Sequence, residues 1–157
     1  MVEKTCHLIL KIVPHNLMTL GLLTQALIGQ ERFEDALNVG STVIELSAIV
    51  GEMPNGMGAI HIKKMADYLL GKKDYVRAVR LWQAGVKCQP GDVNALLELS
   101  QALLSKGDKA GAHQQLRQAQ SLAPQNQAVL ALLRTVALEQ RTAKPVGVLA
   151  RQSKKRH

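Results

Sequence analysis

Three short segments divide this chain in the same way. Pro14-His15-Asn16, Pro90-Gly91-Asp92 and Pro124-Gln125-Asn126 each carry a proline, any residue, then Asn or Asp, before a run rich in Leu and Ala. Proline cannot extend the helix before it, and an Asn or Asp side chain caps the next helix by accepting a hydrogen bond from its free N–H groups. Pro90 and Pro124 lie 34 residues apart. This periodicity predicts an all-α chain built from repeated helix pairs.

Two units of 34 residues, 59–92 and 93–126, share one order of large and small residues. The first helix of each unit shows a large–large–small–large pattern, at Ile62, Met65, Ala66 and Leu69 and at Leu96, Leu99, Ser100 and Leu103. The second helix carries Ala78, Trp82 and Gly85 in one unit and Ala112, Leu116 and Ala119 in the other. The small residues allow two helix backbones to approach closely, and the larger ones fill the space between them.

This order of residues resembles the tetratricopeptide-repeat (TPR) family, closely over 59–126 and more loosely over the rest of the chain. The resemblance implies a tetratricopeptide-type α-solenoid of antiparallel helix hairpins that forms a right-handed superhelix. Its concave groove would be lined by the first helix of each repeat. The resemblance also implies a function, because members mostly bind peptides or helices of other proteins in that groove.

The remaining units depart from the pattern. The repeat at 17–58 is eight residues too long, which we interpret as a longer second helix, from Glu34 to about Val50, and a loop with a turn at 54–56. It also has Gly40 where a bulky residue is expected. Residues 1–16 match the second helix of a partial repeat. Residues 127–143 match a first helix, but Arg134 stands where the pattern has a small residue, so we interpret this helix as the terminal one. We therefore expect a repeat domain over 1–143 and a basic C-terminal tail over 144–157.

The repeat register predicts which side chains face the groove, with a mixture of apolar and polar groups that suits an amphipathic helix or an extended segment. The predicted partner-binding residues are Met18, Leu22, Gln25, Lys63, Lys64, Asp67, Leu97, Glu98 and Gln101. Lys63 matches one position of the clamp with which some family members hold a C-terminal carboxylate. However, Asp67 stands where that clamp carries Asn, and its later basic positions are missing. Lys63 and Lys64 are otherwise read as solvated charges or as contacts to an acidic partner.

The net charge of +8 suggests an alternative function, contact with nucleic acid. The last fourteen residues carry +5 with no acid. A second basic stretch at 63–87 holds Lys63, Lys64, Lys72, Lys73, Arg77, Arg80 and Lys87 against Asp67 and Asp74. Because the chain has no aromatic stacking platform and no zinc or helix-turn-helix signature, this remains the second hypothesis.

Catalysis and cofactors find little support. The five histidines are scattered without metal-ligand spacing, and the glycines of 51–58 lack the Lys-Ser/Thr ending of a phosphate loop. We therefore expect no enzyme, no cofactor and no metal site, and two free thiols, Cys6 and Cys88. No stretch is apolar enough for a membrane span or a good signal peptide, which favours a cytoplasmic protein.

The N-terminal edge suggests a further contact. A second helix without its first helix should leave Val2, Cys6 and Ile9 exposed on one face, whereas repeat arrays normally end in polar capping helices. We hypothesise that a second copy of the chain or a partner covers this edge, the alternative being that the sequence is a piece of a longer repeat protein. The sequence as a whole predicts a protein–protein interaction scaffold, an adaptor of chaperone-like type, with another protein as partner.

Overall fold

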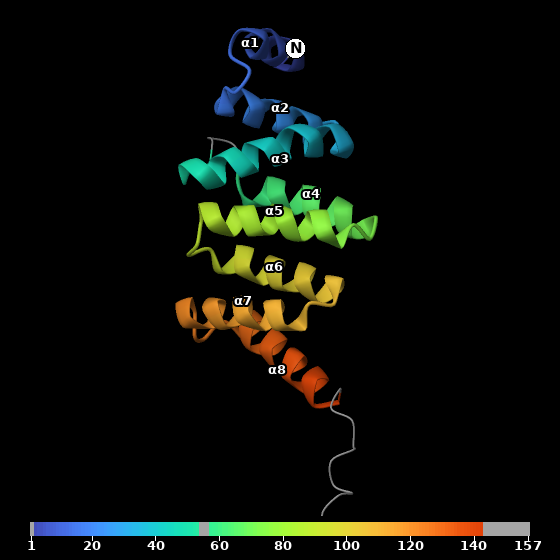
Figure 1. The fold of residues 1–157 in the computed structure, drawn as a ribbon, viewed down its shortest axis with the longest axis vertical. Helices are drawn as coiled ribbons and strands as arrows, with labels where there is room; N and C mark the ends of the chain where they lie inside the picture. Colours follow the sequence, from blue (N-terminus) through green and yellow to red (C-terminus); the bar gives the residue numbers. More distant parts are fainter. Residues whose placement is uncertain (1, 54–56, 143–157) are drawn as a thin grey trace, which may run out of the picture.

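The computed structural model describes residues 2–53 and 57–142, and every regular element in these ranges is an α-helix. In chain order they are α1 (Val2–Ile12), α2 (Leu17–Gly29), α3 (Phe33–Val50), α4 (Ala59–Gly71), α5 (Tyr75–Cys88), α6 (Val93–Lys106), α7 (Lys109–Leu122) and α8 (Gln127–Thr142). They stack along one long axis in the order of the sequence, with α1 at one end and α8 at the other (Figure 1). The predicted all-α solenoid of helix hairpins is confirmed.

The caps predicted from the Pro-x-Asn/Asp segments are present. Asn16 Oδ1 accepts a hydrogen bond from the Thr19 N–H at 2.9 Å and so begins α2. Asp92 Oδ1 accepts from the N–H groups of Asn94 and Ala95, and Asn126 Oδ1 does the same at the start of α8. Each cap satisfies donors that have no partner within their own helix, so the sequence fixes where these helices start.

The three hairpin turns share one backbone feature. Glu31, Lys73 and Gly107 each occupy the fifteenth position of their unit, and each has a positive φ, of 58°, 61° and 89°. A left-handed residue at this place ends the first helix and reverses the chain. The turn is therefore the same in all three units, although only the last one uses the glycine that best tolerates this conformation.

The core consists of the residues that the repeat pattern singles out. Thr24, Ala66 and Ser100, the small residues of the three first helices, are fully buried, and the large residues around them are at most 8% exposed. One cluster of buried side chains extends from α1 to α7, and a second joins α6, α7 and α8. The register deduced from the sequence is thus the register of the packing.

The junction between repeats 17–58 and 59–92 is irregular. Here α3 packs mainly against α5 and only weakly against α4, whereas α5 packs directly onto α6 at the next junction. At Gly40, however, α3 approaches α2 and α4 closely, because a Cβ atom built on this residue would lie 2.8 Å from Thr24 Cγ2 and 3.0 Å from Met65 Sδ. The side chain that the pattern expects on α3 is therefore replaced by Met65 of the following repeat.

Glu34 ties the start of α3 to the following repeat. Tyr68 donates a hydrogen bond to its carboxylate at 3.1 Å, and Lys72 and Arg77 lie within 3.4 and 3.7 Å of it. The hydrogen bond from Tyr68, with smaller effects of the two cations, lowers the pKa of Glu34. The Tyr68 ring also stacks on Phe33, with 5.0 Å between centroids. These polar and aromatic contacts join the two repeats at the surface of the junction.

Two predicted segments, the turn at 54–56 and the basic tail at 144–157, lie outside the described residues. The thiols of Cys6 and Cys88 are free. None of the described helices combines the length and the apolar character needed to cross a membrane.

Candidate partner-binding groove

The α2 part of the predicted groove is apolar. Helix α2 contains no charged residue, and its groove positions expose Met18 and Leu22, whose accessible fractions are 55% and 42%. Gln25 continues the same face one turn later and is half-buried. Exposed side chains of this size on an otherwise buried helix provide apolar area that a partner can cover.

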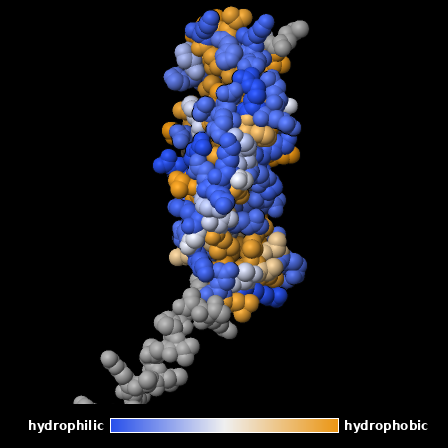
Figure 2. Space-filling model, turned by 90° about the vertical axis from the view of Figure 1, so that its right-hand side faces the viewer, coloured by the Kyte–Doolittle hydropathy of each residue, from blue (hydrophilic) through white to orange (hydrophobic). Residues whose placement is uncertain are grey.

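A hollow of about 280 Å³ adjoins this face where α1 meets α2. Its lining is almost wholly apolar and includes Val2, Cys6, Ile9 and Leu22. Figure 2 shows hydrophobic side chains gathered at this N-terminal end, where Leu8 and Ile12 of α1 are also exposed.

The predicted edge residues do not all behave as expected. Val2 and Ile9 are exposed, at 55% and 39%, but Cys6 is only 4% exposed, so its prediction was wrong. Cys6 lies on the side of α1 that packs against α2, where it joins the main core cluster. The helix exposes a narrower face than the missing half-repeat suggested, and the self-association hypothesis stays a prediction.

The central part of the groove contains an ion-pair network. Lys63 Nζ lies 2.7 Å from Glu98 Oε1 on the next first helix and 3.6 Å from Asp67 Oδ1 one turn along its own helix. The hydrogen bond to Glu98 is the main reason that the pKa of Lys63 is raised. With two carboxylates around it, this ammonium group does not attract a further one, and the groove does not reproduce a carboxylate clamp.

Lys64 and Asp67 border a second, shallower hollow of about 500 Å³. It extends the groove toward the α2–α3 turn and is also lined by Phe33 and Tyr68. The sequence register missed these two aromatic residues, because they are brought to the groove by the irregular junction and not by the repeat positions. In the sequence, the one sign of such a role was that Phe33 lies in the overlong unit 17–58 and Tyr68 in the unit after it.

Leu97 was wrongly predicted to line the groove. It is 8% exposed and belongs to the C-terminal core cluster with Val129 and Val136 of α8. Because Leu97 is buried, the α6 surface of the groove is formed by its polar neighbours. Of these, Glu98 is half-buried and Gln101 is exposed.

The basic residues of 63–87 do not form one surface. Lys63 and Lys64 occupy groove positions on α4, Lys72 and Lys73 lie in the α4–α5 turn, and the others lie on α5. Lys63, Lys72 and Arg77 are each already paired with carboxylates. This distribution lacks the continuous basic path that a nucleic-acid backbone follows.

Within residues 2–53 and 57–142, no three His, Cys, Asp or Glu side chains gather in a way that would hold a metal ion. The groove therefore offers apolar contact area and a few polar groups. Such a surface is suited to binding a partner.

Comparison with known proteins agrees with this geometry. Residues 69–136 match the tetratricopeptide repeat family model. A search of curated proteins gave no match. Among solved structures, the MamA RS-1 ArsTM double mutant is similar over 88% of this chain and 74% of its own, with 17% identity and a TM-score of 0.62.

Two further similar structures are TPR domains. The Arabidopsis OM64 TPR domain has 20% identity and a TM-score of 0.51, over 74% of this chain and 89% of its own. The first TPR of Spaghetti (RPAP3), bound to the HSP90 peptide SRMEEVD, has 12% identity and a TM-score of 0.55, over 80% of this chain and 93% of its own. At these identities the similarity establishes a shared fold.

Proposed function

We propose that the protein is an interaction scaffold, because residues 69–136 match the tetratricopeptide repeat family model and the described chain shares the fold of solved TPR domains. It binds a segment of a partner protein in the groove lined by α2, α4 and α6. The observation that carries this proposal is the exposed apolar pair Met18 and Leu22 on a helix without charges. Because each side chain is only about half exposed, covering it would contribute on the order of 1 kcal/mol, or about 2 kcal/mol for the pair.

The same groove restricts the kind of partner. The segment needs an apolar face for α2 and a polar side of mixed charge for Lys64, Asp67 and Gln101. An acidic C-terminus is a poor candidate, because Glu98 and Asp67 already neutralise Lys63. The peptide SRMEEVD, which is bound in one similar structure, therefore serves as a negative probe for this chain.

The test is affinity capture at low and high salt with the wild-type chain and two variants. Met18→Asp/Leu22→Asp places charges in the apolar part of the groove. Val76→Asp is the matched control, since Val76 lies on α5 and is 54% exposed, almost the same as Met18. We expect a discrete protein that survives high salt, is lost with the double variant and is retained with the control.

Other outcomes would contradict the proposal. Nucleic acid that elutes with rising salt and ignores the groove variant would favour the basic-surface alternative, because counterion release makes such binding steeply salt-dependent. Partner binding that is unaffected by Met18→Asp/Leu22→Asp would place the contact elsewhere. Binding of SRMEEVD that depends on Lys63 would show that the ion-pair network opens to accept a carboxylate.

A further inference from the structure

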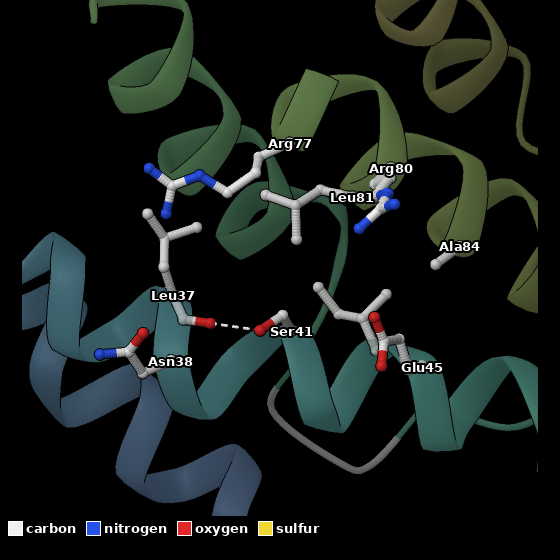
Figure 3. Close-up of a pocket in the computed structure, with 9 residues that line it drawn as sticks. Leu37, Asn38, Ser41, Glu45, Arg77, Arg80, Leu81 and Ala84 are labelled. Carbon is white, nitrogen blue, oxygen red and sulfur yellow. Dashed lines mark hydrogen bonds between the residues drawn. The ribbon is translucent and has the colours of Figure 1, made fainter. Parts of the chain in front are cut away.

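A cleft of about 220 Å³ lies between α3 and α5, away from every residue predicted to line the groove. Its apolar floor includes Leu37, Ile44, Leu81 and Ala84. Figure 3 shows Leu37 of α3 and Leu81 of α5 facing one another across the cleft. Only second helices of the hairpins form this cleft, whereas first helices line the predicted groove.

The cleft results from the irregular junction. At this junction α3 packs mainly against α5, and no comparable contact joins α5 to α7 among the described helices. The cleft thus lies at a helix contact that the regular junction lacks among the described residues. A second, shallower hollow lined by Ala48, Ile49 and Lys87 continues it along the same two helices. Ile49 is 82% exposed, so the apolar surface extends onto the rim.

The two walls differ in charge. Helix α5 contributes Arg77 and Arg80 to the cleft and Lys87 to its continuation. Arg77 is already paired with Asp74 and Glu34, but no carboxylate of the described residues lies within 4.0 Å of Arg80 or Lys87. On the opposite wall, the polar groups are Asn38, Ser41, whose hydroxyl donates to the Leu37 carbonyl, and Glu45.

The spacing of the two unpaired cations defines a complementary partner. Arg80 and Lys87 are two helical turns apart on the same face, a separation of about 10 Å. A helix lying along the cleft would match them with two acidic residues seven positions apart. Between these acids it would need aliphatic side chains that reach the floor formed by Leu37, Ile44 and Leu81.

We propose that the α3–α5 cleft is a second docking site, which binds an acidic amphipathic helix of a partner protein. Carboxylates of the helix pair with Arg80 and Lys87, and its aliphatic side chains enter the cleft above Leu81 and Ala84. The site is independent of the groove proposed above, so the two proposals fail or survive separately. A scaffold with both sites would hold two segments at once, on opposite sides of the solenoid.

The probe is a labelled, alanine-rich peptide of about 18 residues, long enough to be partly helical, with two glutamates seven residues apart and two leucines midway between them. Binding is measured by fluorescence anisotropy. Two control peptides replace either the glutamates by lysines or the leucines by alanines. We expect the wild-type chain to bind the probe and neither control peptide, and an absence of binding up to about 1 mM, where affinity contributes only about 4 kcal/mol, overturns the proposal.

Three variants locate the binding. Arg80→Glu/Lys87→Glu should weaken it by about tenfold or more, whereas the equal charge change Lys11→Glu/Lys106→Glu on exposed positions elsewhere should have little effect. Ala84→Phe should weaken it by filling the cleft without changing charge. Glu45→Gln should strengthen it about two- to fivefold, because it removes the acid from the opposite wall, while Glu52→Gln should not.

The variants also keep the proposal falsifiable. Circular dichroism establishes that each variant is folded. If Ala84→Phe does not fold, the proposal is still tested by Arg80→Glu/Lys87→Glu and Glu45→Gln, which should change peptide binding in opposite directions. A single-stranded oligonucleotide serves as a second probe. Equal effects of the two charge-reversed double variants, or tight oligonucleotide binding that ignores Ala84→Phe, would show a general polyanion surface and overturn the docking site.

Discussion

The two inner junctions of the solenoid join neighbouring repeats in different ways. Between repeats 59–92 and 93–126, α5 packs directly onto α6, and Trp82 fills the space at the bulky position of the second helix. Between repeats 17–58 and 59–92, the same position is Gly40, and α3 packs mainly onto α5. The first junction is determined by the repeat pattern itself, while the second depends on Met65 from the following unit.

The comparison shows that the same repeat position can require a large side chain at one junction and none at another. At Trp82 the packing needs volume, and at Gly40 it needs the absence of a side chain. The irregular junction compensates with contacts outside the pattern, including the Phe33–Tyr68 stack and the bonds of Glu34. The cleft between α3 and α5 lies at this irregular junction.

Truncation of the bulky side chain at the regular junction should have the largest effect on stability. Trp82 is 2% exposed, so Trp82→Ala should lower the free energy of unfolding by about 3–5 kcal/mol through lost burial and a new cavity. Urea denaturation followed by circular dichroism measures the loss. Val76→Ala on the exposed side of the same helix should change it little, and a loss below about 1 kcal/mol at Trp82 would contradict the assigned packing.

Addition of a side chain at the irregular junction should be the next largest effect. Gly40→Leu supplies the bulky residue that the repeat pattern expects, but its Cβ alone would meet Thr24 and Met65. We expect a loss of about 1–3 kcal/mol from overpacking, despite the better helix propensity of leucine. Gly71→Leu is the control, since nothing lies within 4 Å of a Cβ there, and stabilisation by Gly40→Leu would refute the close approach of the helices.

The helix caps should distinguish the two regions by a smaller amount. Asp92 accepts two backbone hydrogen bonds at the start of α6, whereas Arg32, at the start of α3, makes no side-chain cap. Asp92→Ala should therefore cost about 1 kcal/mol, and Arg32→Ala, which loses only exposed ion pairs, less than that. Equal losses in urea denaturation would indicate that the Arg32 pairs with Glu3 and Asp35 contribute as much as a cap.

The smallest expected effect is a pH dependence at the irregular junction. His61 Nδ1 accepts a hydrogen bond from the Gly58 N–H at 3.3 Å, and burial, with a smaller contribution from Lys64, lowers the pKa of His61 below its usual 6.5. The unfolded chain then binds a proton at a higher pH than the folded chain does. Stability is fully present above about pH 6.5 and falls as the pH decreases toward the folded pKa.

Urea midpoints at several pH values for the wild type and His61→Gln measure this effect. The wild type should lose more stability on acidification from pH 7.5 than the variant does. A difference of the opposite sign would mean that the folded chain favours the imidazolium and that the bond to Gly58 does not form. Acid loss at lower pH is shared by both proteins, because the pKa values of Glu34 and Asp74 are lowered by Tyr68 and Arg77.

The groove predictions show where reasoning from the repeat register works and where it stops. Met18 and Leu22 are exposed, which is compatible with the groove positions that the register gives them. Leu97 and Cys6 were misplaced because their exposure depends on a neighbouring helix. The register says which face a residue occupies, but it does not say how far α8 covers α6 or how α1 turns against α2.

The sequence by itself determined the local structure of this protein: where the helices begin, where the hairpins turn and which residues form the core. These features depend on capping, backbone conformation and helical periodicity, all of which act over a few residues. Only the tertiary structure decided the packing of α3 against α5, the pairing of Lys63 with Glu98 and the cleft beside Arg80. Those features depend on how whole helices lie against one another, and residues far apart in the chain set that arrangement together.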